Sequence, residues 1–284
     1  MARKVFNAGG APSNDWSVVG NWDVGSIPAT GDTAVLTGGT SIVAGLDQHL
    51  VNLAELIVPP EFTGVIGNSP SDPLKIGATR VVLNGGGIGA GSTVGWLDAG
   101  VTFDFDDVVV NRTGTGIQEF VIMGTIVRAQ LTKGKLTFYS GTVSKLYADA
   151  PSGQGANAIW KNIASVITDA FQRSGTGSTE GGTITNLNVD LDTFVSNLAA
   201  TITNLIQRGG TVTWGTTATL ALLRALGGTF DATADYRAKT ITEIDAHEGS
   251  TVKLNNLVGN IIATTVRKFG NAVILGPDGK VFDL

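Results

Sequence analysis

A glycine followed within two residues by threonine recurs near the C-terminal end of the chain at nearly constant spacing. Gly210, Gly228 and Gly249 begin three such phrases, and Gly270 begins a degraded copy. Taken as equivalent positions, these glycines recur at a period of about 20 residues, which is typical of solenoid repeats. Self-similarity at such a period indicates a solenoid in which each repeat forms one coil.

The residues after each glycine alternate in a way that predicts a strand with one buried side. Thr213, Asp231 and Lys253 would point away from that side. The positions expected to face inward are Val212 and Trp214, Phe230 and Ala232, Val252 and Leu254, and Ala272 and Ile274.

A second apolar segment precedes each glycine in constant register. Its members are three residues apart, and the pairs are Ile202 with Leu205, Leu220 with Leu223, and Ile241 with Ile244. Each coil therefore has two apolar segments and two corners. Since a lone coil cannot offset about 1 to 2 kcal/mol of backbone entropy per residue, the coils must stack and merge their apolar sides. We expect an all-β, single-stranded parallel β-helix, or β-solenoid, with coils of about 18–21 residues, an N-terminal cap and a C-terminal hairpin.

Composition narrows the classes of partner. The 39 glycines suit corners, and charged residues make up 15% of the chain with a net charge of −5. No basic cluster suggests nucleic-acid binding, and no apolar run approaches the roughly 18 residues needed to cross a bilayer. The chain has no cysteine and no N-terminal secretory signal pattern. We therefore expect no nucleic-acid or membrane partner and no cofactor.

Three parts are predicted along the chain. Residues 1–45 are interpreted as a cap or attachment segment, with Trp16, Trp22, Pro28 and Asp32 as its main residues, because an open end coil needs covering. Residues 46–270 would form the parallel β-helix. Residues 271–284 would close the other end as a hairpin around a Pro-Asp-Gly turn.

Three stretches need a choice between interpretations. Residues 156–173 place apolar residues four apart, which is typical of an amphipathic helix, and the choice between helix and strand stays open. Residues 219–228 are rich in Leu and Ala but keep the register of their neighbours, so a strand is predicted. The glycine run at 85–91 lacks the spacing of a phosphate loop and is interpreted as a corner.

The stretch from Asn21 to Val35 resembles an opening found in β-helical proteins of tailed bacteriophages and in some bacterial surface proteins. The stretch from Phe62 to Gly67, followed by Leu74 to Ile76, looks like a second element of the same kind. With the glycine and threonine phrases, the similarity spans most of the chain, although its motifs describe architecture rather than activity. The bacterial relatives usually carry secretion signals and membrane anchors, which favours the virion proteins here.

The resemblance implies a capsid decoration, head fibre or tail component, often trimeric, that is made in the host cytoplasm and bound to other virion proteins. The expected function is therefore that of a non-enzymatic virion structural protein. The alternative is a tailspike-type protein that binds or degrades glycans.

Candidate chemical residues are few. Asp104 and Asp106 would share one strand face beside Asp107, as a carboxylate pair for a divalent cation or a glycosidase, but alternation favours a solvated wall. His49 and His247 lie far apart in sequence and are interpreted as surface histidines. No catalytic set is predicted.

Polar and aromatic residues of the repeats have simpler interpretations. Trp96, Trp160 and Trp214 could stack on sugars, but Trp214 occupies a core position of the repeat. Asn186 and Asn204 occupy the same place in two successive copies of a Thr-Ile-Thr-Asn-Leu phrase, which predicts a small stacked amide ladder.

Overall fold

The computed structural model describes residues 1–85, 93–111, 119–151, 158–234, 237–254 and 261–276. The chain divides into two compact units, Met1–Ser144 and Lys145–Leu284. Strands dominate, and helix amounts to 1%. In the described part of the chain, no helix is long and apolar enough to cross a membrane.

The first unit contains a succession of strands and one turn of 3₁₀ helix, η1 (Val19–Asn21), which lies between the first and second strands. The strands are β1 (Arg3–Phe6), β2 (Thr33–Leu36), β3 (Asp47–Val58), β4 (Leu74–Leu83), β5 (Thr93–Asp98), β6 (Phe105–Asn111) and β7 (Glu119–Ala148), whose last residues belong to the second unit. Strand β1 pairs with β2, β2 with β3, β3 with β4, β4 with β6, and β6 with β7, always in parallel.

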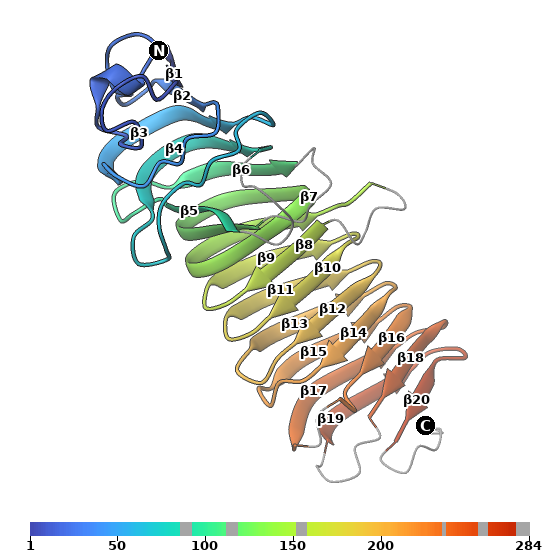
Figure 1. Ribbon diagram of the computed structural model, residues 1–284. Coiled ribbons are helices and arrows are strands. Elements are labelled where there is room, and N and C mark those ends of the chain that lie inside the picture. Colours follow the sequence, from blue (N-terminus) through green and yellow to red (C-terminus); the bar gives the residue numbers. More distant parts are fainter. Residues whose placement is uncertain (86–92, 112–118, 152–157, 235–236, 255–260, 277–284) are drawn as a thin grey trace. The chain divides into compact units, whose positions relative to one another are not determined.

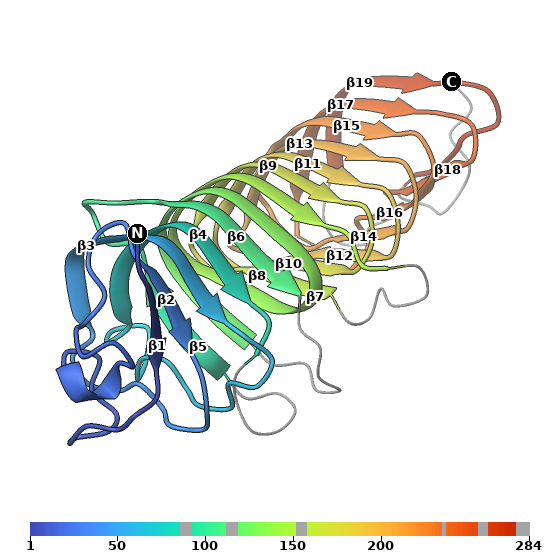
Figure 2. The ribbon, with the colours of Figure 1, turned by 90° about the horizontal axis from the view of Figure 1, so that it is seen from above.

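The second unit has two walls of stacked parallel strands (Figures 1 and 2). The short-strand wall consists of β8 (Ala158–Asn162), β10 (Thr176–Thr179), β12 (Thr193–Ser196), β14 (Thr211–Trp214), β16 (Gly228–Asp231), β18 (Ser250–Lys253) and β20 (Val273–Leu275). The long-strand wall consists of β9 (Val166–Gln172), β11 (Thr183–Val189), β13 (Thr201–Gln207), β15 (Leu220–Ala225), β17 (Lys239–Ala246) and β19 (Ile261–Lys268).

This arrangement confirms the predicted parallel β-helix, with about 10 turns in the described residues. Every inward position predicted after the glycines is buried, and Thr213, Asp231 and Lys253 are partly exposed. Phe230 pairs in register with Val212 on one side and with Val252 on the other. Side chains of one column therefore stack directly within the core.

The register of the last coils differs from the spacing of the glycines. Strand pairing places Ser250, rather than Gly249, opposite Gly228, and it places Val273 opposite Thr251. The equivalence of Gly249 and Gly270 with Gly228 is therefore wrong by one and two residues. The strands keep their register because the extra residues are accommodated in the corners, where Gly249 and Gly270 have φ values of 81° and 63°.

The apolar pairs three residues apart mark a bend within the strands of the long-strand wall. Where β11 pairs with β13, Ile184 pairs with Ile202 and Asn186 with Asn204, while the residues between them are unpaired. The bend turns two consecutive side chains outward. Buried pairs with this spacing occur in both units: Leu53 and Leu56, Ala78 and Val81, Phe105 and Val108, Ile126 and Ala129, Ile167 and Ala170, Ile184 and Leu187, Ile202 and Leu205, Leu220 and Leu223, and Ile241 and Ile244.

The ambiguous stretches are strands wherever they are described. Residues 158–162 and 166–172 form β8 and β9, so the described part of the stretch at 156–173 forms strands and not a helix. The stretch at 219–228 contains β15, which confirms the strand prediction. Nearly all of the glycine run at 85–91, and the turn and second half of the C-terminal hairpin at 277–284, lie outside the described residues.

Two buried glutamines hold the corners that follow the long strands. The Gln172 amide nitrogen donates to the carbonyl oxygens of Gly175 at 2.9 Å and Thr193 at 3.0 Å. The Gln207 amide nitrogen donates to the carbonyl oxygen of Thr229 at 2.9 Å and to that of Gly210 at 3.2 Å. Buried carbonyl groups of the corners are thereby satisfied across neighbouring coils.

Candidate functional site

Five threonines form one outward column along the short-strand wall. In register order they are Thr176, Thr193, Thr211, Thr229 and Thr251. All are half-buried or exposed, and among the described residues none of their hydroxyls has a hydrogen-bond partner. Since parallel strands lie about 4.8 Å apart, the column presents regularly spaced hydroxyl and methyl groups without charge.

The next outward column of this wall gains charge toward its end. It passes from Val195 to Thr213, Asp231 and Lys253. The Lys253 ammonium lies 3.5 Å from the Asp231 carboxylate. Burial raises the pKa of Asp231, but hydrogen bonds from Thr233 and the charge of Lys253 outweigh it and leave that pKa below its ordinary value.

The long-strand wall carries the predicted amide ladder. The Asn204 amide nitrogen donates to the Asn186 side-chain oxygen at 2.9 Å, and Asn186 donates to the Asp169 carboxylate at 2.8 Å. The ladder is confirmed and extends one coil further than predicted. The amide and carboxylate groups of the ladder hydrogen-bond to one another along the stack of coils, which is a structural role.

Ion pairs also follow the columns. In the first unit, Arg80 lies 3.0 Å from Glu55 and 3.7 Å from Asp107, and Arg128 lies 2.9 Å from Asp107. These residues pair in strand register, so opposite charges alternate from coil to coil. Such cross-strand pairs each contribute about 0.2 to 1 kcal/mol.

The acidic candidates do not form a site. Asp104 and Asp106 are exposed, while Asp107 binds Arg80 and Arg128 instead of joining them. In the described part of the chain, no three His, Cys, Asp or Glu side chains gather closely enough to hold a metal ion. A structural role for Asp107 follows, and Asp104 and Asp106 lie on the wall.

The two histidines have separate surroundings. His49 is exposed, and its Nδ1 lies 2.6 Å from the Asp47 carboxylate, whose pKa this hydrogen bond lowers. His247 is half-buried and stacks on Phe269 at a ring-centroid distance of 4.4 Å. Neither ring lies near a candidate nucleophile in any described contact.

The tryptophans belong mainly to the core. Trp160 and Trp214 are fully buried and contact Phe194 and Phe230 at 5.5 and 5.9 Å between ring centroids. The prediction of a core role for Trp214 is confirmed. Trp160 is likewise inaccessible to a sugar, and Trp96 is half-buried.

Aromatic rings pack together in the N-terminal segment. Trp22 packs edge-on against Phe6 at 5.2 Å and against Trp16 at 4.7 Å, and its indole nitrogen donates to the Trp16 carbonyl oxygen at 2.8 Å. All three rings are buried, as is Pro28. The same segment contributes β1 and β2 to the coils, so it contains coil strands as well as these rings.

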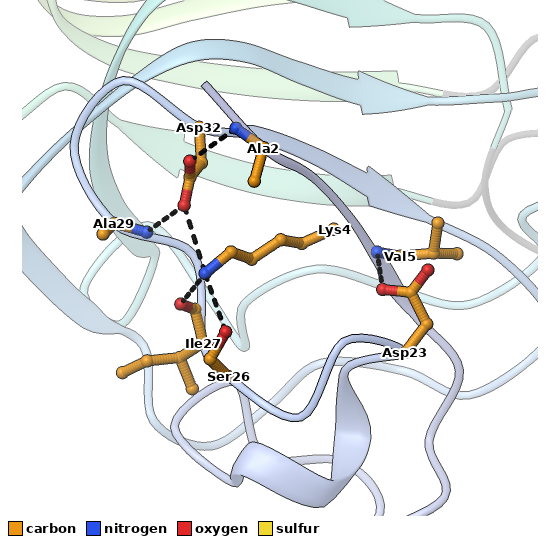
Figure 3. A network of polar contacts seen from close by, with 8 residues as sticks. All are labelled: Ala2, Lys4, Val5, Asp23, Ser26, Ile27, Ala29 and Asp32. Carbon is orange, nitrogen blue, oxygen red and sulfur yellow. Dashed lines mark hydrogen bonds and ion pairs between the residues drawn. The ribbon is translucent and has the colours of Figure 1, made fainter.

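A polar network ties this segment to the first coil strand (Figure 3). The Lys4 ammonium lies 3.1 Å from the Asp32 carboxylate and donates to the Ile27 carbonyl oxygen at 2.8 Å and to the Ser26 hydroxyl at 3.0 Å. The Asp32 carboxylate accepts the Ala2 backbone N–H at 2.8 Å. One lysine therefore joins the strand to two turns of the following loop.

Hydrogen bonds from backbone N–H groups dominate the electrostatics of Asp32. Those from Ala2 and Ala29, helped by the Lys4 ammonium, lower the pKa of Asp32 to about 2. The Asp23 carboxylate accepts the Val5 N–H at 2.8 Å nearby (Figure 3). Asp23 thus occupies a backbone donor of β1 that an edge strand would otherwise offer to another chain. Ala2, whose N–H binds Asp32, precedes β1, and its carbonyl oxygen accepts the Thr33 N–H of β2.

A cavity of about 390 Å³ opens on the short-strand wall. Its lining comes from β12 and β14, from the residues that follow these strands, and from two residues between β16 and β17. The residues that line it are Val195, Ser196, Asn197, Leu198, Thr213, Gly215, Ala234 and Arg237. It lies at the C-terminal edge of two strands, beside the threonine column.

Comparison of the chain with family models, curated proteins and solved structures gave no match.

Sequence reasoning missed the residues that shape the corners. The contacts of Lys4, Gln172 and Gln207 are visible in the structure alone. A long polar residue at a register position where an apolar one is expected could have indicated a buried side chain that bonds the backbone. Arg237 was missed because nothing in its local sequence places it at a cavity that residues of β12 and β14 also line. The extra length of that coil was the available sign.

Proposed function

We propose that the protein is a non-enzymatic structural component of a phage-like virion, a capsid decoration or head-fibre protein that assembles as a trimer. The observation that carries this proposal is the threonine column on the short-strand wall. It supports a role in assembly because the column is regular, uncharged and partnered by no described side chain.

Burying the threonine column against another subunit costs little desolvation. Charged groups lose much hydration free energy at an interface, and the column contains none. Threonine adds a methyl group for packing and a hydroxyl that can hydrogen-bond across the contact. The resemblance of residues 21–35 to openings of phage β-helical proteins favours virion proteins as the partners.

The internal bonding of the coils supports a structural rather than a catalytic use. The carboxylates Asp107, Asp169 and Asp245 bind neighbouring coils through Arg128, Asn186 and Arg267. These carboxylates, which could otherwise serve as catalytic groups, thus bind neighbouring coils to one another.

The test combines oligomer mass with particle binding. We expect light scattering to give three chains per particle, and we expect the protein to co-sediment with capsids of its own phage. Thr193→Lys with Thr211→Lys should yield monomers that remain folded, because both side chains are exposed. Thr265→Lys, on the exposed side of the long-strand wall, is the matched control and should stay trimeric. A monomeric wild type that binds no capsid and degrades a polysaccharide would contradict the proposal.

A further inference from the structure

The long-strand wall carries two outward columns of threonine up to its bend. In the first column Thr183 pairs in register with Thr201, and the register of the next strands continues the column through Thr219 to Thr240. The second column lies two residues further along each strand. Its members are Thr168, Thr185, Thr203, Ala221, Thr242 and Thr264. We call these two columns together the threonine face.

The threonine face is uncharged, and its hydroxyls are unpaired within the described part of the chain. All of its threonines are half-buried or exposed, and no described group hydrogen-bonds to their hydroxyls. The inward residues between the two columns, such as Ile184, Ile202 and Ile241, are fully buried. Because a close-packed core holds these strands in register, the outward side chains keep a fixed spacing.

Strand geometry sets the spacing of the threonine face in two directions. Neighbouring parallel strands lie about 4.8 Å apart, and side chains two residues apart on one strand are separated by roughly 6.6 Å. In tetrahedral water, two oxygens bonded to the same molecule at about 2.75 Å lie about 4.5 Å from each other. The repeat along the stack of coils therefore differs from that of an ice lattice by only about 0.3 Å per coil.

We propose that the threonine face binds the surface of ice. Each hydroxyl is a donor and an acceptor, so it can take the place of a lattice water, while the methyl groups lie in the spaces between lattice positions. Ice is a neutral lattice, and a face without charge complements it because no ion has to give up hydration on contact. This binding is independent of the proposed assembly function, which uses the short-strand wall.

The test measures crystal shaping and the inhibition of ice recrystallisation by the purified full chain. We expect the protein to give faceted crystals and to inhibit recrystallisation. Thr203→Lys with Thr219→Lys places two cations in the middle of the threonine face. It should raise the protein concentration needed for inhibition by at least about tenfold, because desolvation of each charge opposes contact. Thr242→Lys, a single change at an exposed position, should act in the same direction.

Thr102→Lys is the matched control, since Thr102 is an exposed threonine of the first unit that belongs to neither column. It should inhibit recrystallisation as the wild type does. Circular dichroism melts verify that each variant folds, and Thr242→Lys decides the test if the double variant does not.

Three results would overturn the proposal: unshaped crystals with the wild type, equal inhibition by wild type and Thr242→Lys, or an equal loss in Thr102→Lys. A lower oligomer mass of Thr242→Lys in light scattering would instead assign the threonine face to a contact between copies of the chain, and it would also overturn ice binding.

Discussion

At the scale of single residues, buried polar side chains determine how the coils turn. Gln172, Gln207 and Asn162 are at most 1% exposed, yet each satisfies backbone groups at a corner. An unpaired buried polar group costs about 1 to 3 kcal/mol, so these amides are tolerated because the corner carbonyls and N–H groups need them. The same reasoning applies to Lys4, which is 7% exposed.

Asp32 should make the N-terminal segment sensitive to acid. Because its folded pKa of about 2 lies below the ordinary 3.8, its stabilisation is present above pH 3.8 and is lost as the pH falls through 2. Asp32→Asn should lower the unfolding free energy at pH 7 by about 1.5 kcal/mol or more, the value of a charge-assisted hydrogen bond. It should also reduce the loss of stability between pH 4 and pH 2. Thermal unfolding followed by circular dichroism over this range measures both effects.

Asp106→Asn is the control for that experiment, because Asp106 is exposed and has no described partner. It should track the wild type at every pH. If the wild type and Asp32→Asn lost the same stability between pH 4 and pH 2, the predicted contribution of Asp32 would be refuted.

At the scale of elements, the corners are more constrained than the strands. Gly210 and Gly228 have φ values of 66° and 74°, and a side chain at Gly228 would meet the Gly210 carbonyl oxygen at 2.5 Å. Backbone of the neighbouring coil therefore fills the space where a Cβ would lie. At Gly249, with φ of 81°, nothing lies within 4 Å.

These two glycines allow a matched comparison. Gly228→Ala and Gly249→Ala should both incur left-handed strain of about 1 to 2 kcal/mol. Gly228→Ala should cost a further 1 to 3 kcal/mol or so, because the overpacked backbone must shift. Urea unfolding of the two variants measures the difference. If Gly249→Ala were the more damaging change, close packing of the coils at Gly228 would be refuted.

At the scale of the whole molecule, stability should depend on the number of stacked coils. Every pairing between neighbouring strands of the short-strand wall joins successive coils in parallel register. In such a repeat architecture, stability is approximately a sum of coil and interface contributions. Removing one coil in register should then shorten the molecule without changing the fold of the rest.

Deletion of Thr211–Gly228 tests this expectation, because Thr229 pairs with Thr211 and can take its place after Gly210. We expect a folded protein with a β-type circular dichroism spectrum and a lower unfolding enthalpy. Deletion of residues 211–219 removes a partial coil and should give an unfolded or aggregated protein, since inward and outward positions no longer match. Equal folding of the two deletions would contradict the coil boundaries.

Much of the architecture could be predicted from particular residues. Val212, Trp214 and Phe230 revealed the buried side of a strand because the side-chain period of a strand is two. The pair Ile202 and Leu205 revealed a second apolar segment, although its spacing of three residues did not disclose the bend. Asn186 and Asn204 predicted their ladder because identical side chains at one register position must stack.

The sequence by itself determined the fold class, the inward residues of the C-terminal coils and the existence of two walls, because these follow from local periodicity and from the need to bury apolar surface. The tertiary structure alone decided the strand identity of residues 158–162 and 166–172, the register of Gly249, the corner contacts of Gln207 and the position of Arg237 at a cavity that residues of β12 also line. Those features depend on which backbone groups of a neighbouring coil remain to be paired, and on how a longer coil accommodates its extra residues. The sequence of a single repeat encodes neither the unpaired groups of its neighbour nor the path of the extra residues.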